Sequence, residues 1–250
     1  MAAPHRGIIM PTDFISVAEE TGQIVEIGAW VLNQACHWAG SRQPEASKLT
    51  VAVNISGRQL LAGSFVGTVR QALQDSGLPP QFLMLEMTES QLIESTDLTI
   101  GILLELKQLG VALAIDDFGT GYSSLSYLSR FPIDILKIDR SFVESMSSSQ
   151  DKKELTEAIV RLGSTLRLRT VAEGIEEQGQ LAVLRDMGCQ RGQGYLFSHG
   201  LPADEVDVLI AAHEAALAPG PDRPMRGGGN APGVGRPDTP VFQGRLVNGV

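Results

Sequence analysis

Cysteine, histidine and long apolar runs are all scarce in this chain of 250 residues. Its two cysteines, Cys36 and Cys189, lie far apart without a CxxC spacing, which argues against a disulfide framework and a zinc site. No spacing suited to metal binding occurs among the four histidines, His5, His37, His199 and His213. No apolar run approaches the roughly 20 residues of a membrane span, and the N-terminus lacks the apolar stretch of a signal peptide. We therefore expect a cytoplasmic protein without a membrane segment.

The chain also lacks an excess of positive charge. It has 20 Lys and Arg against 29 Asp and Glu, a net charge of −9, and a pI near 4.9. This balance repels a nucleic-acid backbone, and no basic stripe interrupts it, so a nucleic-acid polymer is not an expected partner. A polyanionic ligand would need metal ions in order to bind.

One domain and a tail account for the whole chain. The hydrophobic content of 43% is enough for one large core, which we assign to residues 1–217. Residues 218–250 begin with a segment rich in Gly, Pro and Arg that buries too little apolar surface to fold, so we expect a flexible, disordered tail. Residues 241–247 have weak strand character, and an unstructured terminus is the preferred interpretation.

Short β-branched runs alternate with longer segments of helical period. The runs are residues 49–53, 82–85, 111–115, 133–136 and 168–172, with a last strand near 189–193. This alternation predicts parallel strands joined by crossover helices, as in a TIM-like (β/α) barrel. Helices are indicated at 24–34 and before Gly110 and Gly188, which we interpret as C-caps. Six strands fall short of the eight of a closed barrel, and the shortfall lies at the N-terminus.

Polar residues stand at the C-terminal end of each predicted strand. Two adjacent carboxylates, Asp116 and Asp117, leave one strand and enter a glycine-rich turn. The complete set, in strand order, is Asn54, Glu86, Asp116 with Asp117, Lys137, Glu173 with Glu176, and Gln193. Because the C-terminal strand ends of a β/α barrel converge on one face, these residues predict one site built from oxygen ligands and a lysine.

Each of these residues also has a purely structural interpretation. Asn54 would cap a helix, Glu86 would form a surface ion pair, and Lys137 would pair with Asp139. Six such coincidences in register are less probable than one site. Carboxylate and amide oxygens favour Mg²⁺ or Mn²⁺ over zinc, and two such cations would activate a water and clamp a phosphodiester. Lys137 would orient or deprotonate that water, so phosphodiester hydrolysis is the expected reaction.

The turn after Asp117 also approximates a dinucleotide-binding fingerprint. Gly119, Thr120 and Gly121 begin it, and Asp139 follows at about the distance of a ribose-binding acid. However, Ser124 replaces the third glycine, and the two aspartates would repel a pyrophosphate that had no metal. A nicotinamide enzyme is therefore the weaker hypothesis.

The same motifs resemble the EAL family of cyclic di-GMP phosphodiesterases over about residues 4–210. The matching motifs, in order, lie at residues 11–15 with 18–22, 53–56, 85–90, 116–124, 136–142, 171–176 and 192–197. The resemblance implies hydrolysis of cyclic di-GMP to linear pGpG with Mg²⁺ or Mn²⁺ in a two-metal site. It implies metal ligands at Asn54, Glu86, Asp116, Asp117 and Glu173.

Further roles follow from the same resemblance. Lys137 would contact the metal-bound water, with Glu173 and Glu176 as the other catalytic residues and Gln193 as support. Glu89 would hold the loop that begins at Asp117 and contains Gly119, Thr120 and Gly121. The family uses this loop in substrate binding and dimer contacts, so a homodimer is among the expected partners. Structurally, Thr88 would instead form a capping box with Gln91.

One family feature has no counterpart in the sequence. Family members begin with a strand containing Glu-Ala-Leu, whose Glu is a metal ligand and whose following Arg helps hold the substrate. The chain opens at Ala3-Pro4-His5-Arg6-Gly7, where the family has the loop after that strand. We therefore expect an incomplete barrel, either a fragment or a degenerate member, with impaired hydrolysis. The alternative is a non-catalytic cyclic di-GMP receptor or protein-interaction module.

Overall fold

The computed structural model describes residues 2–3, 7–42, 49–93, 97–121, 128 and 130–217. The expected tail, including the segment 241–247, lies outside the described residues, as do residues 122–124 of the glycine-rich turn. In the described part of the chain, every helix is too short or too polar to cross a membrane.

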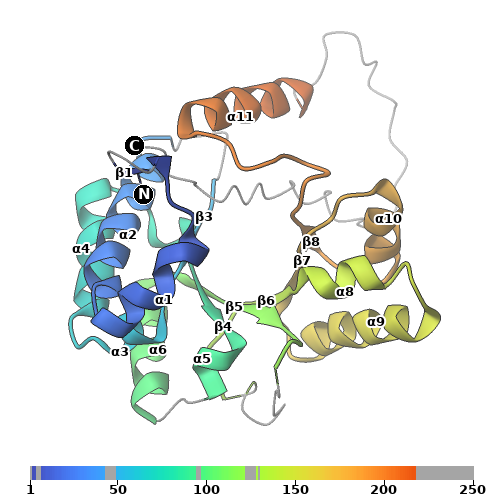
Figure 1. The fold of residues 1–250 in the computed structure, drawn as a ribbon, viewed down its shortest axis with the longest axis horizontal. Coiled ribbons are helices and arrows are strands. Elements are labelled where there is room, and N and C mark those ends of the chain that lie inside the picture. The colour runs from blue at the N-terminus through green and yellow to red at the C-terminus, as the bar shows by residue number, and fades with distance from the viewer. Residues whose placement is uncertain are drawn as a thin grey trace, which may run out of the picture.

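Six parallel strands form the central sheet, and they follow one another in chain order. They are β3 (Val51–Asn54), β4 (Leu83–Thr88), β5 (Ala112–Phe118), β6 (Ile135–Ile138), β7 (Arg169–Ala172) and β8 (Arg191–Gly192). The sheet curves into a half-barrel with helices on its outside (Figure 1). All six predicted strands are confirmed, and the incomplete barrel is confirmed with them. The sequential order has no reversal point, so this is not the doubly wound sheet of a dinucleotide-binding enzyme.

The two edges of the half-barrel are β3 and β8. Among the strands that the structure describes, none pairs with the outer edge of β3. A separate antiparallel pair, β1 (Ala2–Ala3) with β2 (Gly7–Ile8), precedes the first helix and was not predicted. Within the described residues, the outer edge of β3 thus has no strand partner of the kind that a closed barrel would supply.

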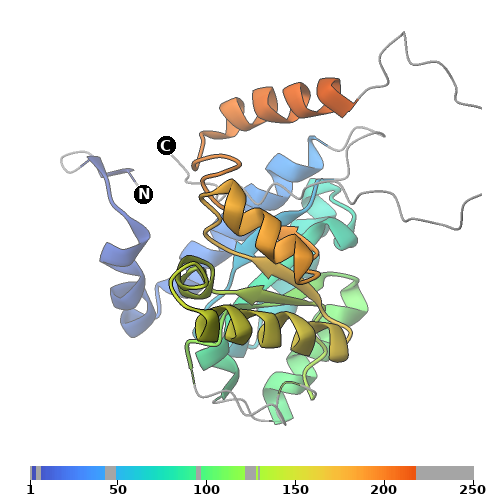
Figure 2. The same cartoon turned by 90° about the vertical axis from the view of Figure 1, so that its right-hand side faces the viewer.

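Helices connect the strands and cover the convex face of the sheet. Before β5 they are α1 (Pro11–Thr21), α2 (Ile24–Gly40), α3 (Gly57–Leu61), α4 (Phe65–Ser76), the 3₁₀ turn η1 (Pro80–Phe82), α5 (Glu89–Ile93) and α6 (Asp97–Leu109). After β6 they are α8 (Arg140–Ser145), α9 (Gln150–Thr165), α10 (Gln178–Asp186) and α11 (Ala203–Leu217). Figure 2 shows α8, α9 and α10 side by side, with α11 apart from them. Gly110 and Gly188 follow α6 and α10 with φ of 94° and 84°, as expected for C-caps.

The helix predicted at 24–34 is confirmed as α2, but one large apolar residue of this segment lies outside its buried face. Trp30 is 49% exposed. The buried face instead contains Leu32, Cys36 and Ala39. Small residues define this face because α2 packs closely against α4 and β3, which leaves no room for the indole ring.

Side chains alternate across the sheet and divide its interior into two layers. Leu83, Leu85 and Met87 of β4 point into the large core between sheet and helices. The residues between them point to the concave face. There a smaller apolar layer is formed by Met84, Ala114, Ile135 and Val171. The polar residues at the strand ends lie directly above this layer.

Asp134 fixes the opposite, N-terminal ends of the central strands. Its carboxylate lies 2.7 Å from Nζ of Lys107 and accepts a hydrogen bond from the backbone N–H of Leu113 at 2.8 Å. Its backbone carbonyl accepts from the N–H of Arg169 at 2.9 Å. One residue thus joins α6, β5 and β7 on the face away from the polar strand ends.

Candidate metal site

The polar residues of four strands lie directly above the concave apolar layer. Each stands two residues after a member of that layer, so the strand period of two puts it on the same face. The pairs are Met84 with Glu86, Ala114 with Asp116, Ile135 with Lys137, and Val171 with Glu173. The convergence expected from the sequence therefore has a simple geometric basis.

Lys137 stands at the centre of this group. Its Nζ atom lies 2.8 Å from Oε2 of Glu86, 2.9 Å from Oδ1 of Asp116 and 2.6 Å from Oε1 of Glu173. The lysine side chain is only 4% exposed. The structural alternative, in which Lys137 pairs with Asp139, is wrong. Asp139 instead caps α8 by accepting a hydrogen bond from the N–H of Ser141.

A β-bulge brings the two adjacent aspartates to the same side of β5. Ile115 pairs with Leu136 and Phe118 with Ile138, so β5 has one more residue than β6 between these pairs. Asp117 adopts the bulged conformation. Its φ is 54°, which is left-handed and uncommon for residues other than glycine. Its N–H donates to Oδ1 of Asp116 at 3.1 Å. In a regular strand the two side chains would point to opposite faces.

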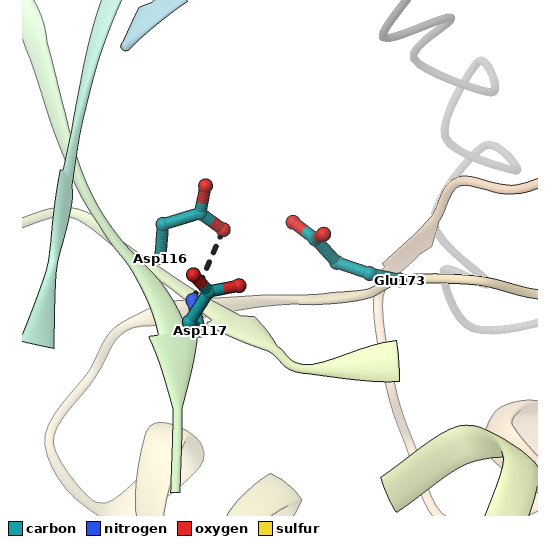
Figure 3. Close-up of side chains that lie close together, drawn as sticks. All are labelled: Asp116, Asp117 and Glu173. Atoms are coloured by element: carbon teal, nitrogen blue, oxygen red, sulfur yellow. Dashed lines mark hydrogen bonds between the residues drawn. The ribbon is translucent and has the colours of Figure 1, made fainter. Parts of the chain in front are cut away.

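The bulge completes a carboxylate cluster. One oxygen from each of Asp116, Asp117 and Glu173 lies within 4.8 Å of the other two. Figure 3 shows the three side chains directed into the same space, two from β5 and one from the segment after β7. Three carboxylates, those of Glu86, Asp116 and Glu173, contact the ammonium group of Lys137, and the Asp117 carboxylate lies beside two of them.

The charges of this cluster do not balance within the described residues. Burial raises the pKa of Glu173 to about 8 against the opposing charge of Lys137, and Asp116 adds to the rise. Burial alone would lower the pKa of Lys137, but Glu86, Glu173 and Asp116 raise it overall. The ammonium thus stays charged and cannot neutralise every carboxylate, so a further cation would be stabilised here.

Glu173 is held in the cluster by an ion pair. Its Oε1 atom is buried and lies 2.6 Å from Nζ of Lys137. Carboxylate oxygens with free lone pairs are the ligands that hard divalent cations prefer. The residues present therefore fit a divalent metal.

The other expected site residues stand around the cluster. Asn54 ends β3 opposite Glu86 in register, and its side chain is exposed. Glu176 lies on the rim, where its Oε1 is 3.0 Å from Nη2 of Arg140. Gln193 holds the segment after β7 through its backbone, donating to the carbonyl of Ala172 and accepting from the N–H of Ile175. The expected roles of Asn54 as a metal ligand, of Glu176 as a catalytic residue and of Gln193 as support stay predictions.

The loop after β5 is held by Glu89, the first residue of α5. Oε2 of this buried glutamate accepts a hydrogen bond from the N–H of Gly119 at 2.8 Å. Thr120 turns back, and its hydroxyl donates to the carbonyl of Asp117 at 2.9 Å. A Cβ atom on Gly121 would lie 3.0 Å from Oε1 of Glu89. The backbone therefore passes closely over the Glu89 carboxylate.

The structure also tests the expected helix-capping roles of Asn54 and Thr88. The cap of α3 is Ser56, not Asn54, and it forms a reciprocal capping box with Gln59. The N–H of Thr88 donates to Oε1 of Gln91 at 3.2 Å, which is one half of the expected capping box. The side chain of Asn54 therefore does not cap α3.

Sequence reasoning missed Arg140, Phe142 and the β-bulge. Arg140 pairs with Glu176 from another crossover, a contact that no sequence spacing indicates. Phe142 lies against the loop after β5. The bulge had one available signal, because two adjacent aspartates with a shared function cannot both face one side of a regular strand.

Comparisons with known proteins agree with this geometry. The family model described as the EAL domain matches residues 1–200. Cyclic di-GMP phosphodiesterase NbdA of Pseudomonas aeruginosa is 44% identical over 222 residues, covering 86% of this chain and 28% of that protein. Cyclic di-GMP phosphodiesterase PdeR of Escherichia coli is 41% identical over 201 residues, covering 80% and 30%. The chain thus spans less than a third of the length of these curated relatives.

A solved structure extends the likeness to three dimensions. The P. aeruginosa MucR phosphodiesterase in complex with c-di-GMP has a TM-score of 0.78 and 42% sequence identity. The match covers 82% of this chain and 83% of that one. Since the family model covers most of the sequence and the half-barrel matches as well, the chain belongs to the EAL domain family.

Proposed function

We propose that this chain is a cyclic di-GMP phosphodiesterase domain that hydrolyses cyclic di-GMP to linear pGpG with two Mg²⁺ or Mn²⁺ ions. The observation that carries the proposal is the excess of carboxylates around Lys137 on the concave face of an EAL half-barrel. Relatives named as phosphodiesterases and a solved relative bound to c-di-GMP support the choice of substrate.

The proposed roles follow the arrangement of the strand ends. Asn54, Glu86, Asp116, Asp117 and Glu173 hold the metal ions. When bound, such ions activate water and stabilise the charge that develops on the phosphodiester. Lys137 offsets the repulsion between the carboxylates and orients the attacking water. Glu176 and Gln193 support the segment that carries Glu173, and Glu89 fixes the loop from Asp117 to Gly121.

We further propose that hydrolysis by the 250-residue chain is slow. The outer edge of β3, next to the strand that ends in Asn54, is unpaired within the described part of the chain. The family places one more ligand, the Glu of Glu-Ala-Leu, on a strand for that position. A missing ligand and its supporting contacts typically cost about 10–100-fold in metal affinity or activity. The same open edge favours the second candidate function, a cyclic di-GMP receptor without turnover.

Two finer expectations belong to the same proposal. A homodimer would use the loop after β5, as the family does. Size-exclusion chromatography with light scattering tests the homodimer, and a single molar mass equal to that of the monomer at all concentrations would refute it.

A cytoplasmic location would suit the free thiols of Cys36 and Cys189.

The test of the proposed function compares two proteins in Mn²⁺. One is the 250-residue chain, and the other is the completed chain, which carries an added N-terminal strand with Glu-Ala-Leu from a relative. We expect at least about tenfold faster pGpG release from the completed chain, which gains a metal ligand. Equally fast release from both would refute the impairment. Binding of cyclic di-GMP without product from either would favour the receptor.

A further inference from the structure

The loop after β5 rests on the aromatic ring of Phe142, a residue of α8. A Cβ atom on Gly119 would lie 2.7 Å from both Cε2 and Cζ of Phe142 and 3.4 Å from Cδ1 of Ile159. Real Cβ atoms do not approach other atoms this closely, so a side chain at this position would require the ring of Phe142 to move. Gly119 also has φ of 97°, which disfavours any other residue independently.

The same glycine is held from a second direction. Its N–H donates to Oε2 of Glu89 at 2.8 Å, while the Phe142 ring occupies the space that a side chain would take. A carboxylate from α5 and an aromatic ring from α8 thus restrain one residue. Since a hydrogen bond fixes direction and ring contact limits displacement, the pair defines the position of Gly119 closely.

Gly119 follows the bulge residue Asp117 by two positions. Between them Phe118 pairs with Ile138 of β6 and ends the bulge, and Thr120 returns to bind the carbonyl of Asp117. A displacement of Gly119 must therefore change the bulge conformation on which the Asp117 carboxylate depends. That carboxylate belongs to the cluster with Asp116 and Glu173.

Phe142 links the loop after β5 to the neighbouring strand β6. It belongs to α8, which begins two residues after β6, the strand of Lys137. The turn between them is fixed because Asp139 accepts a hydrogen bond from the N–H of Ser141 at 3.0 Å. The ring is thus tied to the same strand as the central lysine.

We infer that Phe142 is a positioning residue, whose ring, acting through Gly119, sets the place of the Asp117 carboxylate in the metal site. The inference deepens the proposed function and rests on it, since it takes Asp117 as a metal ligand. It gives α8 a role in the site although none of its residues belongs to the carboxylate cluster.

The experiment measures Mn²⁺ affinity by titration calorimetry in two matched glycine variants of the full chain. Gly119→Ala places a methyl group against the Phe142 ring. Gly188→Ala is the control, because Gly188 has a similar φ of 84° but no atom within 4 Å of its Cβ position. Both variants place an alanine at a similar positive φ, and only one meets the ring. Thermal unfolding of both proteins confirms that they are folded at the titration temperature.

We expect Gly119→Ala to weaken Mn²⁺ binding by about tenfold or more, as for loss of support around a metal ligand, and Gly188→Ala to leave it unchanged. Phe142→Leu, which removes the ring but keeps an apolar side chain, should weaken binding in the same direction. It should also make Gly119→Ala less damaging in the double variant. Equal affinities for the two glycine variants, or no effect of Phe142→Leu, would overturn the inference while leaving the proposed function intact. Absence of Mn²⁺ binding by the unsubstituted chain would overturn both.

Discussion

Oε1 of Glu173 lies 2.6 Å from Nζ of Lys137. The same ammonium group lies 2.8 Å from Glu86 and 2.9 Å from Asp116. One ammonium therefore serves three carboxylates, and their combined negative charge would stabilise a bound metal ion. The ammonium of Lys137 and a bound metal cation would therefore both stabilise the carboxylate cluster.

Lys137→Met should destabilise the metal-free protein by about 3–5 kcal/mol, because removing one partner leaves buried charges uncompensated. Saturating Mn²⁺ should then raise the melting temperature of the variant more than that of the unsubstituted chain, since the metal supplies the lost positive charge. Differential scanning calorimetry with and without Mn²⁺ measures both effects. Lys152→Met, an exposed position on α9, is the matched control. An unchanged melting temperature for Lys137→Met would contradict the account.

Glu173→Gln should lower Mn²⁺ affinity by about 10–100-fold, since a carboxylate ligand becomes a neutral amide of nearly the same shape. Glu157→Gln provides the control, because Glu157 lies on α9 and forms an ion pair with the exposed Arg161. Calorimetric titration with Mn²⁺ measures both variants. Similar affinities for the two would show that the metal binds elsewhere.

Asp134→Ala should reduce stability without affecting the metal site. The variant loses the contacts with Lys107 and the N–H of Leu113, and we expect a cost of about 1–3 kcal/mol, as for unpairing a hydrogen-bonded polar group. Asp134 lies at the N-terminal strand ends, opposite the site face. Urea unfolding and Mn²⁺ titration of the same variant separate the two properties. A large loss of Mn²⁺ affinity at unchanged stability would refute this division.

Cys36 should make stability fall at alkaline pH. Burial raises the pKa of its thiol from 9.0 to about 11 in the folded protein. The contribution is thus fully present below pH 9 and is lost as the pH rises towards 11, because only the unfolded chain ionises readily. We expect the stability difference between the unsubstituted chain and Cys36→Ala to shrink across this interval in urea unfolding. A difference that stays constant from pH 8 to 11 would exclude a raised pKa.

The strands and the polar residues at their ends were predictable because both depend on local pattern. Alternation of β-branched runs with helical segments placed β3 to β8, and the period of two then put Glu86, Asp116 and Lys137 on one face. The partners of Lys137 were not predictable in detail. Three carboxylates from three different strands compete for it, and only the curvature of the sheet decides which come within reach.

Other features depend on contacts between distant segments and carry little sequence signal. The exposed position of Trp30 follows from close packing of α2 against α4, which favours small residues on the buried face. The ring of Phe142 beneath Gly119 results from the approach of two crossovers. The pair of short strands β1 and β2 has no apolar alternation long enough to be identified.

The most direct test of the central claim is release of pGpG from cyclic di-GMP by the completed chain in Mn²⁺, measured beside its Glu173→Gln variant. The account predicts product from the completed chain, no product after chelation of the metal, and loss of turnover in Glu173→Gln with the fold retained. A completed chain that is folded and loaded with Mn²⁺, binds cyclic di-GMP and releases no pGpG would contradict it and identify a receptor.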